Sequence, residues 1–228
     1  MNQFEIKEQL EKLNQFDTEA LSASSDSAFL SHCLHSEAYA VRAKAYLVLE
    51  RWGDIPSILS LGDGFWQTER QWQLRFLHIV AVGRVEAALS LTEQCLFQRD
   101  CPLLIRGAVV AVAAIGGAKG AEILMKFLKS SFCGYLKDEF IAAALAGMLD
   151  RDETAAKTVQ RCCDRDVSLR HIFEILKTKS SGNELLAVYP YPDYLSRCAE
   201  EAGLTPKEWK QLTYFPRRKK KRSAGYEI

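Results

Sequence analysis

The sequence predicts an all-α protein built from helix pairs that repeat in series. A basic residue near the start of an expected helix recurs at intervals of 33, 31, 31 and 33 residues, each time after an apolar residue and before an Ala- and Leu-rich run. The five positions are Arg42, Arg75, Arg106, Lys137 and Arg170. Such a period is typical of helix pairs that stabilise one another by stacking. Composition agrees, because the 228 residues include only 13 Gly and 6 Pro, and no segment alternates apolar and polar residues as a strand does.

Two short helices are expected before the repeats. Ile6, Leu10 and Leu13 lie at helical spacing within residues 2–14. A serine-rich break then separates this helix from a second one. We assign residues 1–35 to an N-terminal capping pair, since the end units of a repeat array need a polar outer cover.

The first repeat has the clearest pattern. One face of its first helix carries apolar residues that step by three and four positions. These residues are Ala38, Val41, Ala45, Val48 and Trp52. Gly53 suits the left-handed position that ends a helix, and Asp54 suits the cap of the next one. The repeat array is expected to begin here and to cover residues 36–188.

The later repeats follow the same plan. The second, over 67–98, is expected to break at Gly83, and the third, over 102–131, at Gly116. The helix before Gly116 is apolar on nearly all sides, as expected at the centre of a stack. The fourth repeat is expected to place Phe140, Ala144 and Met148 on one helix, and the fifth is partial.

The chain after the repeats differs in composition. Two closely spaced prolines stop the helix pattern, and residues 189–215 are expected to cap the C-terminal end of the array. Residues 216–228 are expected to form a disordered basic tail. Its six consecutive cations are Arg217, Arg218, Lys219, Lys220, Lys221 and Arg222. The tail is suited to weak, salt-sensitive binding of nucleic acid or an anionic surface, or it serves only solubility. Without these six, residues 1–216 have 24 basic and 28 acidic residues, a net charge of −4.

Cysteine usage and hydropathy indicate an intracellular protein. The seven cysteines are odd in number, and no two are separated by two residues, which is unlike a disulfide framework or a zinc site. The N-terminus lacks the apolar core of a signal peptide. The longest uncharged apolar stretch, residues 107–118, is shorter than the roughly 20 residues of a membrane span. We expect a cytoplasmic protein, or a nuclear one in a eukaryotic host.

The segment Val41–Asp54 resembles one unit of the HEAT-like repeats, particularly the short kind found in bilin lyases. That kind opens with Val-Arg, continues through Ala and Leu, and closes with Gly-Asp. Ile105-Arg106 followed by Gly116-Gly117 is a second match. The resemblance implies a right-handed α-solenoid of about five HEAT-like helix pairs over residues 36–188.

The resemblance also implies a function. Most HEAT-like arrays are non-enzymatic scaffolds or adaptors that bind another protein or a peptide segment on their concave face. Two alternatives remain open: a nucleic-acid-binding protein, either similar to the HEAT-like alkyl-base DNA glycosylases or acting through its tail, and a bilin lyase-like protein. The chain has no nucleotide loop, nucleophile elbow or His-Glu-x-x-His motif. We therefore expect no catalytic residue, cofactor or metal.

An aromatic loop is the first candidate partner-binding feature. Phe65 and Trp66 follow Gly64, and Trp72 lies nearby. Aromatic side chains exposed on a glycine-framed loop are frequent interface anchors. The alternative is that Phe65 and Trp66 fold underneath and seal two layers of helices.

Charged and tyrosine side chains supply the other candidates. Lys126, Lys157 and Arg161 lie on the second helices of successive repeats, where a partner would contact them. Each lysine also follows a glutamate by four residues, a spacing that favours an ion pair within its own helix. Tyr189 and Tyr191 are expected to seal the end of the array, or alternatively to bind a peptide or stack on bases.

Three further patterns have structural explanations that we favour. His32, Cys33 and His35 supply only three metal ligands. The glycines after residue 115 are suited to cradling a phosphate, but a turn between paired helices explains them fully. The acidic clusters around Asp152 and Asp166 are expected to cap the helices that follow them.

Overall fold

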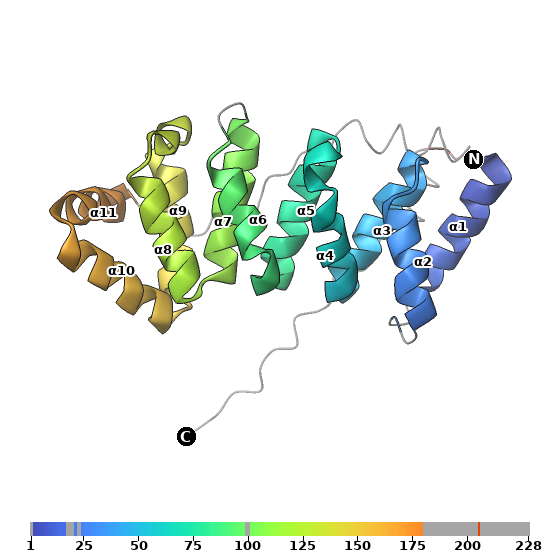
Figure 1. Cartoon of the computed structure of the whole chain (residues 1–228), viewed down its shortest axis with the longest axis horizontal. Coiled ribbons are helices and arrows are strands. Elements are labelled where there is room, and N and C mark those ends of the chain that lie inside the picture. Colours follow the sequence, from blue (N-terminus) through green and yellow to red (C-terminus); the bar gives the residue numbers. More distant parts are fainter. Residues whose placement is uncertain (1, 17–20, 22–23, 99–100, 180–204, 206–228) are drawn as a thin grey trace, which may run out of the picture. The chain divides into compact units, whose positions relative to one another are not determined.

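The computed structural model describes residues 2–16, 21, 24–98, 101–179 and 205 of the chain (Figure 1). These residues contain eleven α-helices, three short 3-10 helices and no strand. The all-α prediction is therefore confirmed for this part of the chain. The predicted C-terminal cap, with Tyr189 and Tyr191, and the cations Arg217–Arg222 lie outside the described residues.

The described residues divide into two compact units. The smaller unit contains α1 (Gln3–Gln15), the end of α2 (Ser24–Leu34) and most of α3 (Tyr39–Trp52). The larger unit contains the beginning of α2, the last turn of α3 and everything described from there to residue 179.

Helix α1 in the smaller unit forms as its sequence predicts. The Asn2 side chain accepts the backbone N–H of Glu5, and the Glu5 side chain accepts that of Asn2, so the two residues form a capping box. Ile6, Leu10 and Leu13 are all buried, which confirms the apolar face that their spacing predicts.

The larger unit contains the remaining helices. Its α-helices after α3 are α4 (Ile55–Asp63), α5 (Arg70–Gly83), α6 (Leu89–Leu96), α7 (Pro102–Ile115), α8 (Gly117–Leu128), α9 (Asp138–Leu149), α10 (Glu153–Arg165) and α11 (Val167–Lys179). The 3-10 helices are η1 (Phe65–Gln67), η2 (Glu86–Ala88) and η3 (Ser131–Tyr135). None of the described helices is both long enough and apolar enough to cross a membrane.

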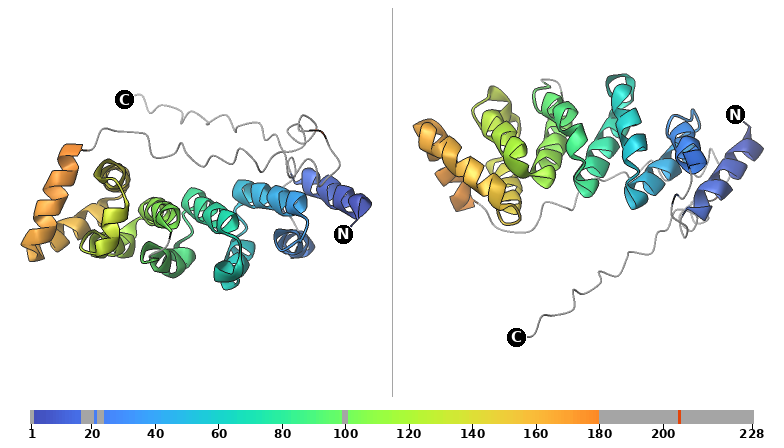
Figure 2. Two further views of the ribbon diagram at one scale, coloured as in Figure 1. Left: turned by 90° about the horizontal axis from the view of Figure 1, so that it is seen from above. Right: turned by 60° about the horizontal axis from the view of Figure 1, so that its bottom comes forward.

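The helices of the larger unit pack in two series. The odd helices α5, α7, α9 and α11 each contact the next odd helix, and the even helices α6, α8 and α10 each contact the next even helix. Within the unit the helices follow one another side by side in chain order (Figures 1 and 2). Odd and even helices also contact each other, as α7 contacts both α6 and α8.

Helix α7 is the most enclosed of these helices. It packs against α5, α6, α8 and α9. Eight of its 14 residues are buried, all of them apolar or glycine. The helix is predicted to be apolar nearly all round; most of it is buried, but Leu103 and Arg106 near its start are exposed, and the hydrophobic core of the unit runs along its buried face.

Basic residues lie near the start of every odd helix from α3 to α11. Arg42, Arg75, Arg106 and Arg170 lie within the first two turns of α3, α5, α7 and α11. Lys137 differs, because it is the N-cap residue of α9 and lies just outside the helix. The sequence period therefore marks the first helix of each pair.

Glycine and aspartate residues end and begin helices where expected, with one exception. Gly53 has φ +67°, and Asp54 caps α4 by accepting the backbone N–H of Ser57. The helix α5 ends at Gly83, where the break is predicted, but the left-handed residue is not the glycine. Gly83 is the last residue of α5, and Arg84 takes the left-handed conformation at φ 50°. A non-glycine residue in this conformation is strained, and no local pattern predicts it.

Candidate functional site

The Asp152 carboxylate joins two helix junctions. One oxygen, Oδ1, accepts the backbone N–H of Ala155 at 3.0 Å and caps α10. The other, Oδ2, accepts the backbone N–H of Gly117 at 2.6 Å, where α8 begins. The hydrogen bonds from Ala155 and Gly117 hold the pKa of this carboxyl below its ordinary value. The capping prediction is confirmed, and the amide of the glycine turn that we considered for phosphate already has an anionic partner.

Asp166 has a similar role one helix later. Its Oδ1 accepts the backbone N–H groups of Ser168 and Leu169 at the start of α11. Its Oδ2 accepts Lys129 Nζ at 2.5 Å. The Lys129 hydrogen bond and the two amides hold the pKa of Asp166 below its ordinary value. Both acidic clusters therefore stabilise helix junctions.

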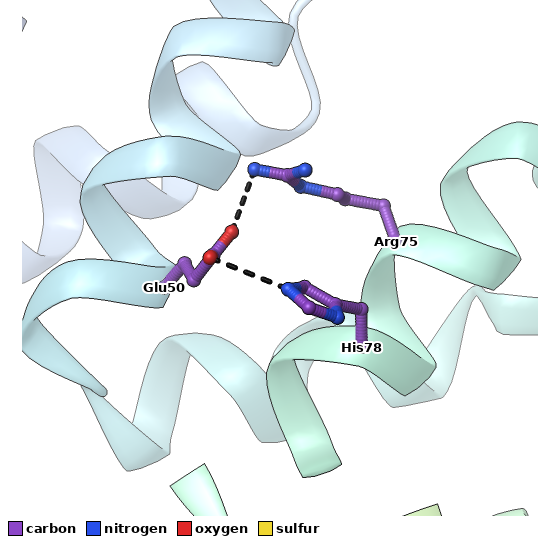
Figure 3. A network of polar contacts seen from close by, with 3 residues as sticks. All are labelled: Glu50, Arg75 and His78. Carbon is purple, nitrogen blue, oxygen red and sulfur yellow. Dashed lines mark hydrogen bonds and ion pairs between the residues drawn. The ribbon is translucent and has the colours of Figure 1, made fainter. Parts of the chain in front are cut away.

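A polar network joins the last turn of α3 to α5 (Figure 3). Glu50 Oε2 lies 2.6 Å from Arg75 Nη2, and Glu50 Oε1 lies 3.3 Å from His78 Nε2. All three side chains are half-buried. Burial opposes ionisation of Glu50, but the hydrogen bond from His78 and the charge of Arg75 outweigh it and hold the pKa of Glu50 below its ordinary value.

An exposed patch lies where α7 meets α9. The guanidinium carbon of Arg106 lies 4.6 Å from the centre of the Phe140 ring. Leu103, one turn before Arg106, is 58% exposed, and Val110, one turn after it, is half-exposed. We call Leu103, Arg106, Val110 and Phe140 the Arg106 patch.

Arg106 differs from the other described cations within α5, α7, α9 and α11. The remaining described Lys and Arg side chains of α5, α7, α9 and α11 all make hydrogen bonds or ion pairs, as the Arg75–Glu50 and Arg170–Asp164 pairs illustrate. Arg106 makes none with the described residues, and its guanidinium lies over the Phe140 ring. Its charged group is exposed and held in place, yet the part of the chain that the structure describes leaves its N–H donors open.

Sequence reasoning missed this patch. The pattern places Phe140 on one helix with Ala144 and Met148, but it does not show that the Phe140 ring is half-exposed with Arg106 over one face. The two residues are 34 positions apart, and only the contact between α7 and α9 brings them together. The available signal was the recurrence of a basic residue at the start of the odd helices, which places Arg106 on an accessible helix face.

The aromatic loop is mostly part of the core. Phe65 is 1% exposed and packs edge-on against Trp66 and Phe76, with ring centres 4.9 and 5.4 Å away. Trp72 is 5% exposed. The partner-binding prediction for Phe65 and Trp72 is therefore corrected, because buried rings cannot anchor an interface. Trp66 is 41% exposed and remains accessible, so the loop both seals the core and presents one ring.

The predicted cations of the even helices pair within the chain. Lys157 pairs with Glu153 at 2.7 Å, as their spacing predicts. Lys126 instead pairs with Glu93 of α6 at 2.8 Å, and its Nζ lies 5.2 Å from the centre of the Phe97 ring. The expected pair of Lys126 with the glutamate four residues earlier is therefore absent, because α6 and α8 contact each other and offer both an acid and a ring.

Arg161 lies on α10 with Lys157. It donates from Nη2 to Thr158 Oγ1 at 2.9 Å. Both cations line a shallow hollow of about 550 Å³ along this helix. These side chains are accessible, but Lys157 and Arg161 each have a polar partner on α10.

No metal cluster is found in the described chain. No group of three or more His, Cys, Asp or Glu residues within it is arranged to hold a metal ion. Cys33, considered beside His32 and His35, is fully buried, and burial raises its pKa to about 12. A buried, protonated thiol is a poor metal ligand.

Comparisons with protein-family models and with curated proteins found no match for this chain. The resemblance to HEAT-like repeats therefore remains a hypothesis based on the sequence pattern.

Proposed function

We propose that this chain is a non-enzymatic protein-binding scaffold, built as an α-solenoid of HEAT-like helix pairs, whose partner binds across the odd helices. One observation carries the proposal: α5, α7, α9 and α11 contact one another in series. Their accessible side chains therefore adjoin, and a segment of another protein can contact several repeats at once.

The Arg106 patch gives this surface suitable chemistry. Interface anchors are commonly aromatic, aliphatic or arginine side chains held in place by their neighbours. Phe140, Leu103 and Arg106 supply one of each type. Because they lie on helices rather than on loops, little conformational entropy is lost when a partner binds.

Bonds between repeats also support a rigid binding surface. Asp152 joins the starts of α8 and α10, and Glu50 joins α3 to α5. Arg151 adds a further link, because its Nη2 donates to the backbone carbonyl of Ala113 at the end of α7. A scaffold whose repeats are fixed relative to one another presents a preformed surface, which favours affinity.

Site-specific photo-crosslinking tests the proposal. A photoreactive residue replaces Val110 on the odd helix α7, and a matched one replaces Gln160, which is exposed on the even helix α10. The full chain is crosslinked in the cells that express it. The captured protein is identified by mass spectrometry and purified, and its binding to the unmodified chain is measured by calorimetry.

We expect one defined partner to crosslink at position 110 far more than at position 160, and to bind with 1:1 stoichiometry when purified. The proposal fails if position 110 captures nothing specific, or if the purified candidate does not bind. Equal crosslinking at both positions would place the partner elsewhere and also contradict it.

A further inference from the structure

We propose that the Arg106 patch recognises an acidic side chain flanked by apolar residues in the partner protein. This inference deepens the proposed function and rests on it. The recognised element is a Glu or Asp carboxylate that approaches the edge of the Arg106 guanidinium while its apolar neighbours cover Leu103 and Val110.

Stacking prepares Arg106 for this role. The guanidinium carbon lies over the Phe140 ring, 4.6 Å from its centre, and no N–H donor of Arg106 bonds to a described residue. The planar set of N–H donors of a guanidinium matches the two oxygens of a carboxylate. An aromatic ring against the guanidinium does not use these donors, so they remain available to a ligand. Because the ring already restricts Arg106, this side chain loses less conformational entropy on binding than an unrestricted arginine would.

The apolar neighbours decide the strength of the contact. A fully exposed ion pair contributes little to binding, because water and salt screen it. Leu103 and Val110 lie three residues before and four residues after Arg106, on the same face of α7. Apolar partner residues that cover them would exclude water from the pair, so the motif should combine acid and apolar residues.

Charge favours a single acidic contact over a polyanion. Residues 1–216 carry a net charge of −4, and the six cations and one glutamate of residues 217–228 bring the whole chain to +1. The other described Lys and Arg side chains of α5, α7, α9 and α11 already have partners. A nucleic acid needs several free cations along its backbone, whereas Arg106 is a single one within α5, α7, α9 and α11, so a polyanion should bind the basic tail rather than the Arg106 patch.

Fluorescence anisotropy with the full chain tests the inference. The probe is a short fluorescein-labelled amphipathic peptide of Leu, Ala and Glu. Two companion peptides carry Gln or Lys in place of Glu, and a labelled RNA oligonucleotide serves as the polyanion. The variants are Arg106→Gln, Arg106→Lys and Phe140→Ala, with Arg165→Gln as a control that removes an exposed arginine from the even helix α10.

We expect the Glu peptide to bind the wild-type chain at least tenfold more tightly than the Gln or Lys peptide. Arg106→Gln should lose about tenfold or more in affinity, since it removes the charge-assisted hydrogen bonds to the carboxylate. Arg106→Lys should lose part of the affinity for the Glu peptide, because lysine lacks the planar set of donors. Phe140→Ala should also lose part of it, because it removes the ring that supports the guanidinium. Arg165→Gln should bind as wild type does.

Three results would overturn the inference: equal binding of the Glu and Lys peptides, unchanged binding by Arg106→Gln, or RNA binding that depends on Arg106. Circular dichroism of each variant establishes that it is folded. If the crosslinked partner binds Arg106→Gln as tightly as wild type, acidic recognition is wrong while the scaffold function stands. If no partner is found on the odd helices, the scaffold function itself fails.

Discussion

The backbone N–H of Gly117 donates to the carboxylate of Asp152 at 2.6 Å, across 35 residues of sequence. The same carboxylate caps α10 through its other oxygen. A single side chain thus satisfies amides at the beginnings of two helices in neighbouring pairs. Since helix N-termini leave backbone donors without partners inside the helix, both bonds replace contacts with water.

Asp152→Ala should lower the free energy of unfolding by about 2 kcal/mol, because it removes a helix cap and leaves the Gly117 amide without its acceptor. Urea denaturation monitored by circular dichroism measures the change. Asp150→Ala is the matched control, since Asp150 is exposed at the C-terminal end of α9, where a negative charge is unfavourable. Equal destabilisation by the two substitutions would contradict the double role of Asp152.

Gly116→Ala should destabilise the protein by about 1–3 kcal/mol. Gly116 has φ +73°, and a Cβ atom there would lie 2.7 Å from Asp152 Oδ2. Gly147→Ala provides the contrast, because Gly147 lies within α9 and a Cβ atom would meet nothing within 4 Å. That substitution should stabilise by about 0.5–1 kcal/mol through helix propensity. Thermal melts of both variants measure the two effects, and a shift of the same sign in both would refute this account.

The Glu50 network should stabilise the protein in a defined pH range. Because the pKa of Glu50 is lower in the folded than in the unfolded chain, its contribution is present above the unfolded pKa of about 4.3 and is lost as the pH falls through the folded value. The difference in unfolding free energy between wild type and Glu50→Gln should therefore be largest near neutral pH and should shrink below about pH 4. Urea titrations at several pH values measure it.

Other carboxylates, including Asp152, lose their contributions in the same acid range. The comparison with Glu50→Gln isolates the network, since those groups are common to both proteins. A difference that stays constant with pH would mean that the ionised state of Glu50 does not stabilise the fold.

Two buried thiols should resist alkylation in the folded protein. Burial raises the pKa of Cys33 and that of Cys95 to about 12 each, so almost no thiolate exists near pH 8. Cys162 is only half-buried. Timed iodoacetamide labelling with peptide mapping should show Cys162 modified well before the other two, with the difference lost in denaturant. Rapid labelling of Cys33 in the native protein would show that its surroundings open.

Much of the helical pattern could be predicted from the chain. The recurring basic residues mark the first helices of the pairs, and Gly53-Asp54 marks a junction that the structure confirms. These features are local, since a helix face or a cap depends on residues within a few positions. The left-handed conformation of Arg84 was not predictable, because tertiary packing and not residue type imposes it.

The candidate site depended on contacts between repeats, which spacing alone does not reveal. Arg106 and Phe140 meet only because α7 and α9 are neighbours. Lys126 has an acid four residues before it, yet it pairs with Glu93 on the preceding even helix. A pattern rule identifies a plausible partner within one helix, whereas the observed partner depends on which helices touch.

The enclosed position of α7 has a consequence for local opening. A helix in contact with four others cannot separate without exposing apolar surface on all of them, whereas α11 at the end of the described series can detach at a smaller cost. Amide protons should therefore exchange with solvent most slowly in α7 and faster towards α11. Leu103, Arg106 and Val110 of the Arg106 patch lie on this helix. A partner would therefore meet a surface whose backbone rarely unfolds locally.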